Sequence, residues 1–207
     1  MLTLFPDSAA LDGPRLTVGG LAADALAAEY GTPLVVLCEE TIRGTARALR
    51  EAVGDGRVFF GTKALPNVAL LRVLREEGVG ADVASAGELA FAVAAGLEGG
   101  ELVVHGNNKE AAFLAAAAGT GAPVVLDAPG EAALAAEAGV RHALVRVTLG
   151  VDADTHEAIR TGHHGSKFGL PPDQARAAAQ TSSRGGPCGS PREYPHRRRA
   201  SRARAPA

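Results

Sequence analysis

The stretch RVFFGTKALPNVALLRVLREEGVGADVAS, residues 57–85, has the patterns of a strand, a helix and a second strand in direct succession. Residues 57–63 are mostly apolar and have the length of a strand, and residues 81–85 have the same character. Between them, leucines recur at helical spacing from Asn67, a residue type favoured at helix N-termini, to Gly78, a type favoured at helix C-termini. The stretch therefore predicts one β–α–β unit.

The same plan repeats on both sides of this unit. Apolar runs of strand length also occur at residues 33–38, 102–106, 123–127 and 143–148, with helix-period segments at residues 40–52, 87–95, 109–118 and 130–138. Strands that are apolar on both faces and alternate with helices are typical of a parallel sheet. Six of them predict the α/β class and an incomplete (β/α)8 TIM-type barrel, which stops short of eight strands.

Composition is that of a soluble globular protein. The chain has 207 residues, of which 46% are hydrophobic and 21% charged, and this indicates one domain with a tail. No run approaches the roughly 18 apolar residues of a membrane span, and the first residues lack the pattern of a secretory leader. Cys38 and Cys188 have neither the spacing nor the neighbours of a zinc site or a disulfide framework. We expect a cytoplasmic protein with no metal and no membrane partner.

The charge divides the chain near residue 180. Residues 1–180 carry 14 lysine and arginine residues against 22 acidic ones, whereas residues 181–207 carry 7 against 1. The second segment has no aliphatic residue larger than alanine, so we expect a disordered basic tail. Its composition is that of a GC-rich gene translated in a shifted reading frame. It has no folded reader module, which argues against a nucleic-acid partner. We expect a lead-in at residues 1–29, a partial barrel at residues 30–180 and this tail.

Polar residues stand at the carboxyl ends of the predicted strands, where barrels of this kind place their chemistry. They are Lys63, Asp82, His105, Asp127 and Arg146. Lys63 ends an otherwise apolar strand, so we expect its amine to be partly dry, that is, partly shielded from water, at the mouth of the barrel. Desolvation there favours the neutral nucleophile. The alternative is a lysine whose ammonium group extends from the rim into water.

Several motifs, in order along the chain, resemble one family. They are residues 18–20 (VGG), 30–34 (YGTPL), 58–64 (VFFGTKA), 80–89 (GADVASAGEL), 105–109 (HGNNK), 154–162 (DTHEAIRTG) and 166–169 (SKFG). The lysine strand and the strand after it are similar to those of the fold-type III pyridoxal-phosphate decarboxylases, whose barrel is alanine racemase-like. The later motifs resemble the diaminopimelate decarboxylases more than the ornithine or arginine decarboxylases. Together the motifs are specific, although each alone is modest.

The resemblance implies decarboxylation of meso-diaminopimelate to L-lysine, with pyridoxal 5'-phosphate as cofactor. It implies Lys63 as the catalytic residue that binds the cofactor covalently, and Asp82, Glu88 and Arg146 as further cofactor-binding residues. Three alternatives remain open. Asp82 and Arg146 form an ion pair inside the barrel. Glu88 only favours the N-terminal turn of its helix. His105 only satisfies backbone groups of its loop.

The resemblance ends after Gln180. The sequence lacks the family's ring-stacking histidine segment, its phosphate-binding glycines, its Glu-Pro-Gly-Arg motif and its C-terminal β-domain, and Cys188 does not match the proton-donating cysteine of that domain. We therefore expect an inactive first part of such an enzyme, and whether it keeps the homodimer of the family is left open. The alternatives are a barrel-only protein of the cofactor-homeostasis type and a binding protein that uses its basic tail.

Overall fold

A parallel sheet of five strands forms the centre of the computed structural model, which describes residues 5–148 and 168–184. Its strands lie in sequence order and pair in parallel, each with the next. They are β4 (Phe59–Gly61), β5 (Gly80–Val83), β6 (Leu102–Val104), β7 (Val124–Leu126) and β8 (Ala143–Val145). This order, with a helix after each strand, is that of a partial (β/α) barrel, as the sequence predicts.

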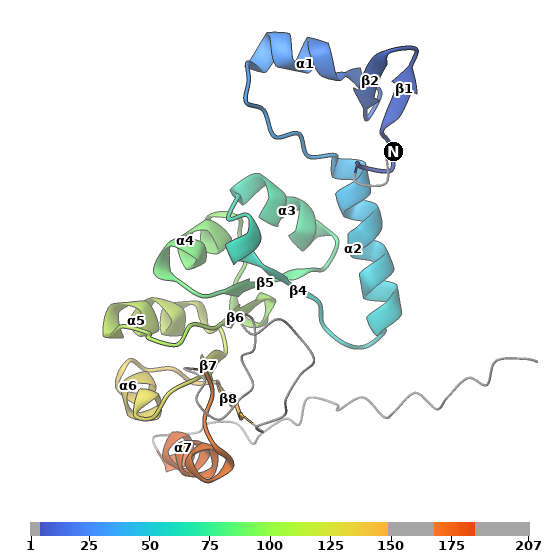
Figure 1. The fold of residues 1–207 in the computed structure, drawn as a ribbon. Coiled ribbons are helices and arrows are strands. Elements are labelled where there is room, and N and C mark those ends of the chain that lie inside the picture. The colour runs from blue at the N-terminus through green and yellow to red at the C-terminus, as the bar shows by residue number, and fades with distance from the viewer. Residues whose placement is uncertain (1–4, 149–167, 185–207) are drawn as a thin grey trace, which may run out of the picture.

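The helices lie along one side of the sheet (Figure 1). They are α2 (Glu39–Val53), α3 (Val68–Glu76), α4 (Ala86–Ala94), α5 (Ala111–Thr120), α6 (Glu131–Glu137) and α7 (Pro172–Arg184). Side chains of β5 to β7 that point to the helices, such as Val83, Val104 and Leu126, are fully buried against α4, α5 and α6. The core therefore lies between the sheet and the helices.

Local sequence signals explain where the helices begin. Asn67 caps α3, because its side-chain oxygen accepts a hydrogen bond of 3.0 Å from Leu70 N. Ser85 caps α4 in the same way through Glu88 N, at 3.2 Å. The capping oxygens satisfy backbone N–H groups that the first helical turn leaves without partners. The five helices predicted between residues 40 and 138 are confirmed, with shifts of one or two residues at their ends.

The strand predicted at residues 33–38 is wrong. These residues are extended, but they pair with no strand, and Val35 is 83% exposed. An apolar run becomes a strand only when a neighbour accepts its backbone hydrogen bonds, and this run joins α1 to α2, away from the parallel sheet (Figure 1). β4 is thus an edge strand of the parallel sheet.

The lead-in forms a small unit of its own. β1 (Ala10–Asp12), β2 (Arg15–Val18) and β3 (Leu21–Ala22) make an antiparallel sheet, and α1 (Ala23–Tyr30) follows directly. None of the residues of α1 is buried.

After β8, the described segment that begins at residue 168 pairs once more with the end of the sheet. Val147 and Leu170 form a parallel bridge, and Leu170 is buried. Helix α7 then continues to Arg184, past residue 180, where the resemblance in sequence ends. Residues 185–207, most of the expected disordered tail, lie outside the described residues. No helix among residues 5–148 and 168–184 is long and apolar enough to cross a membrane.

Candidate active site

A cavity of about 640 Å3 lies at the carboxyl ends of the parallel strands. Its volume falls in the range of about 300–1,000 Å3 that is typical of small-molecule sites. All four predicted site residues line it. The lining consists of Gly61, Lys63, Asp82, Ala84, Glu88, His105, Gly106, Asn107, Asn108, Lys109, Phe113, Arg146 and Phe168. Residues from four strand ends therefore meet in one place, as the strand order predicts.

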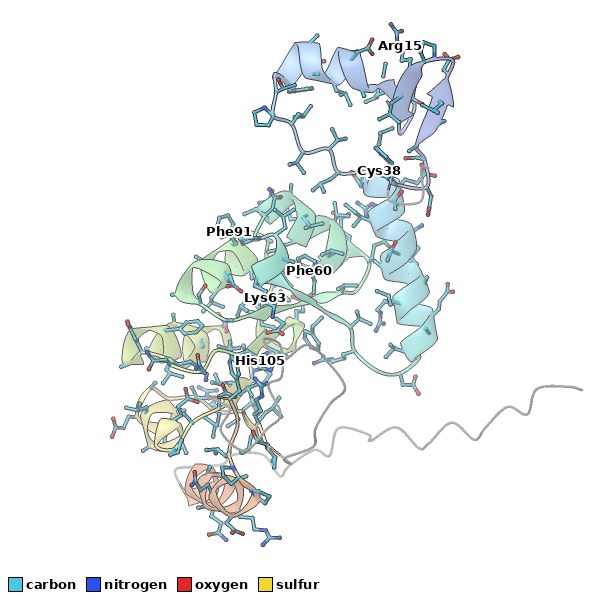
Figure 2. All side chains as sticks on the ribbon, viewed as in Figure 1. Arg15, Cys38, Phe60, Lys63, Phe91 and His105 are labelled. Carbon is cyan, nitrogen blue, oxygen red and sulfur yellow. The ribbon has the colours of Figure 1, made fainter. Side chains whose placement is uncertain are left out.

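Lys63 stands at the mouth of this cavity. It lies in the 3-10 turn Thr62–Ala64 that follows β4, and its side chain is exposed. The expected partly dry environment is therefore wrong for the part of the chain that the structure describes. Figure 2 shows Lys63 and His105 on the side of the sheet that faces away from α4 and α5.

Glu88 holds the turn that carries Lys63. Its carboxylate accepts hydrogen bonds from the buried Thr62 hydroxyl, from Ala84 N at 3.0 Å and from the Ser85 hydroxyl at 3.1 Å. Glu88 also lies in the first turn of α4, where a negative charge is favourable. The structure thus supports the helix-turn interpretation and adds to it a link to the residue next to Lys63.

Asp82 pairs with His105 and not with Arg146. The Asp82 carboxylate lies 2.5 Å from His105 Nδ1, across the neighbouring strands β5 and β6. The alternative of an Asp82–Arg146 ion pair is therefore wrong, because β6 and β7 separate the strands that carry the two residues. The alternative that His105 only satisfies loop backbone groups is also wrong, since its ring binds a carboxylate inside the cavity.

Arg146 has one partner in the loop after β7 and another in the segment that follows β8. Its guanidinium lies 3.5 Å from the buried carboxylate of Asp127 and 4.7 Å from the centre of the Phe168 ring. Asp127 also accepts a hydrogen bond of 3.0 Å from Gly169 N. An arginine held between a carboxylate and a ring has few free rotamers, so Arg146 is positioned before any ligand arrives.

One buried ion pair was missed by sequence reasoning. Lys109 Nζ lies 3.0 Å from both carboxylate oxygens of Glu131, and these side chains are only 1% and 6% exposed. Lys109 stands in the HGNNK motif, and Glu131 stands four residues after Asp127, as Glu88 does after Ala84. That repeated spacing is a signal that sequence reasoning could have used.

The motif at residues 154–162 and Lys167 lie outside the described residues. Within the described ranges, no group of three or more histidine, cysteine, aspartate or glutamate side chains is arranged to hold a metal ion.

The chain matches a family model over residues 39–185, and its description is "Pyridoxal-dependent decarboxylase, pyridoxal binding domain". This range contains Lys63 and every other residue of the cavity. The chain belongs to this family.

Relatives of known name share its sequence and fold. Diaminopimelate decarboxylase of Actinosynnema pretiosum subsp. auranticum is 44% identical over 172 residues, which cover 81% of this chain and 39% of that protein. The corresponding enzyme of Mycobacterium leprae is 45% identical over 153 residues, or 70% of this chain and 32% of the other. The chain thus spans well under half the length of these relatives.

Solved structures agree with the family assignment. Diaminopimelate decarboxylase of M. jannaschii, in complex with L-lysine, is 28% identical with a TM-score of 0.73, over 86% of this chain and 45% of the other. Lysine decarboxylase of Selenomonas ruminantium is 26% identical with a TM-score of 0.65, over 79% and 42%. The partial barrel is therefore the fold of pyridoxal-dependent decarboxylases.

The residues of the cavity fit pyridoxal phosphate, the cofactor of this family. Lys63 offers a primary amine for its aldehyde, and Arg146 and His105 offer hydrogen-bond donors for its polar substituents. Asp82 and Glu88 are already held by other protein groups: Asp82 binds His105, and Glu88 binds the turn that carries Lys63.

Proposed function

We propose that this chain supplies the cofactor lysine of a decarboxylase that converts meso-diaminopimelate to L-lysine. The observation that carries the proposal is that Lys63, Asp82, Glu88 and Arg146 line one cavity at the strand ends. In this proposal residues 30–180 form the cofactor-binding part, between a lead-in of residues 1–29 and a tail of residues 181–207. The location is the cytoplasm, and the homodimer of the family stays a prediction for this chain.

Each side chain has a distinct task in the proposal. Lys63 is the covalent anchor, and Thr62 and Glu88 fix the turn from which it extends. Asp82 holds His105 by Nδ1, which leaves Nε2 to accept or donate a proton. Arg146 presents a fixed cation to an anionic group. Pyridoxal phosphate, when bound, supplies the electron sink for loss of a carboxylate.

Trapping with borohydride tests the role of Lys63. The purified chain is incubated with pyridoxal phosphate, reduced and mapped by peptide mass spectrometry. We expect the label at Lys63 and not at Lys109, because the Lys109 ammonium is buried in an ion pair. Lys63→Arg, which keeps the charge but lacks the amine for this bond, is the control and should lose the label. Equal labelling of Lys63, Lys109 and Lys167 would overturn the proposed role.

Carbon dioxide release tests how much of the reaction these 207 residues perform. We expect none from diaminopimelate above a pyridoxal-phosphate blank, because the segments that the resemblance assigns to the phosphate, the ring nitrogen and the proton donor do not occur in the sequence. A turnover of about one per second, within the usual enzyme range, would contradict this expectation.

A further inference from the structure

Lys109 and Glu131 form a buried ion pair beside the cavity. Their side chains are 1% and 6% exposed, and both oxygens of Glu131 lie 3.0 Å from Lys109 Nζ. Burying two charges is costly, and such a pair is often no more stabilising than apolar residues of the same volume. Stability alone therefore gives a weak reason for this pair.

The pair joins two loops of the rim. On one side, Lys109 Nζ donates a hydrogen bond to the carbonyl oxygen of Gly106, in the loop after β6. On the other side, Glu131 accepts hydrogen bonds from Asp127 N at 2.7 Å and Ala128 N at 3.3 Å, in the loop after β7. One ion pair thus fixes the backbone of both loops.

The loop after β6 leaves little freedom at Gly106. Its φ is +105°, and a Cβ atom at this position would stand 2.8 Å from the carbonyl oxygen of Ala84. The neighbouring His105 N is bound to Val83 O at 2.7 Å. Lys109 therefore fastens the Gly106–Asn107 peptide, one residue beyond His105, and so limits the movement of the loop from which the imidazole extends.

We propose that Lys109 and Glu131 are positioning residues of the candidate site: they hold His105 against Asp82, and Asp127 against Arg146. The inference rests on the proposed function for its meaning in catalysis, but not for its test. Lys109 reaches the His105 loop through Gly106, and Glu131 reaches the Arg146 partner through Asp127 N. Neither residue needs to touch the substrate.

The test compares Lys109→Met, Glu131→Gln and the double variant in the 207-residue chain. Ring 15N shifts report which nitrogen of a neutral histidine carries the proton, and a His105→Gln spectrum assigns the signals. In the parent chain we expect one tautomer, with Nδ1–H donated to Asp82. In all three variants we expect averaging of both tautomers at His105, with His142, at the opposite end of β8, unchanged.

The double variant separates positioning from mere stability. It buries no unpaired charge, so its denaturation midpoint should recover toward that of the parent. A positioning role predicts that its His105 signals still average, because no ammonium holds Gly106. Where the single variants fail to fold, the double variant decides the question.

Parent-like His105 signals in the folded double variant would overturn the inference. Failure of the proposed function has another signature, since the parent chain would then carry no label at Lys63 while the His105 signals of parent and variants still differed.

Discussion

The turn between β5 and α4 and the turn between β7 and α6 are built in the same way, but they differ in what completes them. In the first, Ala84 N donates to Glu88 at 3.0 Å, and in the second Asp127 N donates to Glu131 at 2.7 Å. In each case the glutamate stands four residues after the donor. The remaining acceptor capacity goes to a neutral hydroxyl, Thr62, in the first turn and to a buried ammonium in the second.

This difference shows how one local device serves two purposes. The glutamate of each turn closes the link between strand and helix, which requires only neighbours in sequence. Its second partner comes from the preceding βα unit and determines the electrostatics. At Glu88 the result is a carboxylate with uncharged partners, which keeps its negative charge at the cavity beside Lys63. At Glu131 it is a buried ion pair, neutral as a whole, of which only Lys109 lines the cavity.

The largest expected effect is that of Glu131→Ala. Removal of this carboxylate leaves the Lys109 ammonium buried without its counter-charge, which should lower the free energy of unfolding by about 3–5 kcal/mol. Urea denaturation followed by circular dichroism measures the change. The matched control is Glu137→Ala, an exposed glutamate at the end of the same helix, for which we expect a change within about 0.5 kcal/mol. Similar losses for Glu131→Ala and Glu137→Ala would show that the buried ion pair adds nothing to the stability of this turn.

The strands and helices that flank the two turns could be predicted from the sequence, but the second partner of each glutamate could not. The strand and helix pattern from residue 57 to residue 148 follows from local periodicity and capping residues, and so does the meeting of Lys63, Asp82 and Arg146 at one end of the sheet. Which charge pairs with which depends on the stagger and spacing of strands. From the sequence only Arg146 was considered as a charge partner of Asp82, whereas the strand order places His105, on the adjacent strand, beside it.

The failed strand at residues 33–38 has the same kind of cause. Its composition is that of a buried strand, but pairing is a property of two segments, and β4 receives no partner from this run. The exposure of Lys63 likewise depends on which other elements surround it, and the sequence of its own strand carries no information about those elements.

The second expected effect is smaller and falls on Glu88→Ala. This change removes the acceptor for Thr62, Ala84 N and Ser85, but it leaves no buried charge without a partner. We expect a loss of about 1–3 kcal/mol in the free energy of unfolding and slower borohydride trapping at Lys63. Glu88→Gln keeps an acceptor oxygen and should retain most of the stability. A loss for Glu88→Ala as large as that for Glu131→Ala would show that the charge of the partner is not what distinguishes the turns.

A third glutamate, Glu77, extends the comparison to the surface. It follows α3 and lies between Arg43 and Arg47 of α2, at 2.9 and 2.7 Å, in a network whose outer members are exposed. Hydrogen bonds from Arg47 and Arg43 lower the pKa of Glu77 to about 2. Because both arginines can turn to water when the carboxylate is lost, we expect Glu77→Gln to have the smallest effect of the three at neutral pH.

The pH dependence gives this last prediction its sharpest form. In the unfolded chain the carboxyl of Glu77 has its ordinary pKa of 4.5, whereas in the folded chain it is about 2, so the folded state binds a proton less readily. The contribution of Glu77 is therefore complete above about pH 4.5 and disappears as the pH falls toward about 2. Urea unfolding of the parent and of Glu77→Gln between neutral pH and about pH 3 should show two curves that converge in acid, while Glu51→Gln, on an exposed part of α2, should run parallel to the parent throughout. A constant gap between parent and Glu77→Gln would mean that the arginines stabilise α2 and α3 by packing their aliphatic stems and not through the charge of Glu77.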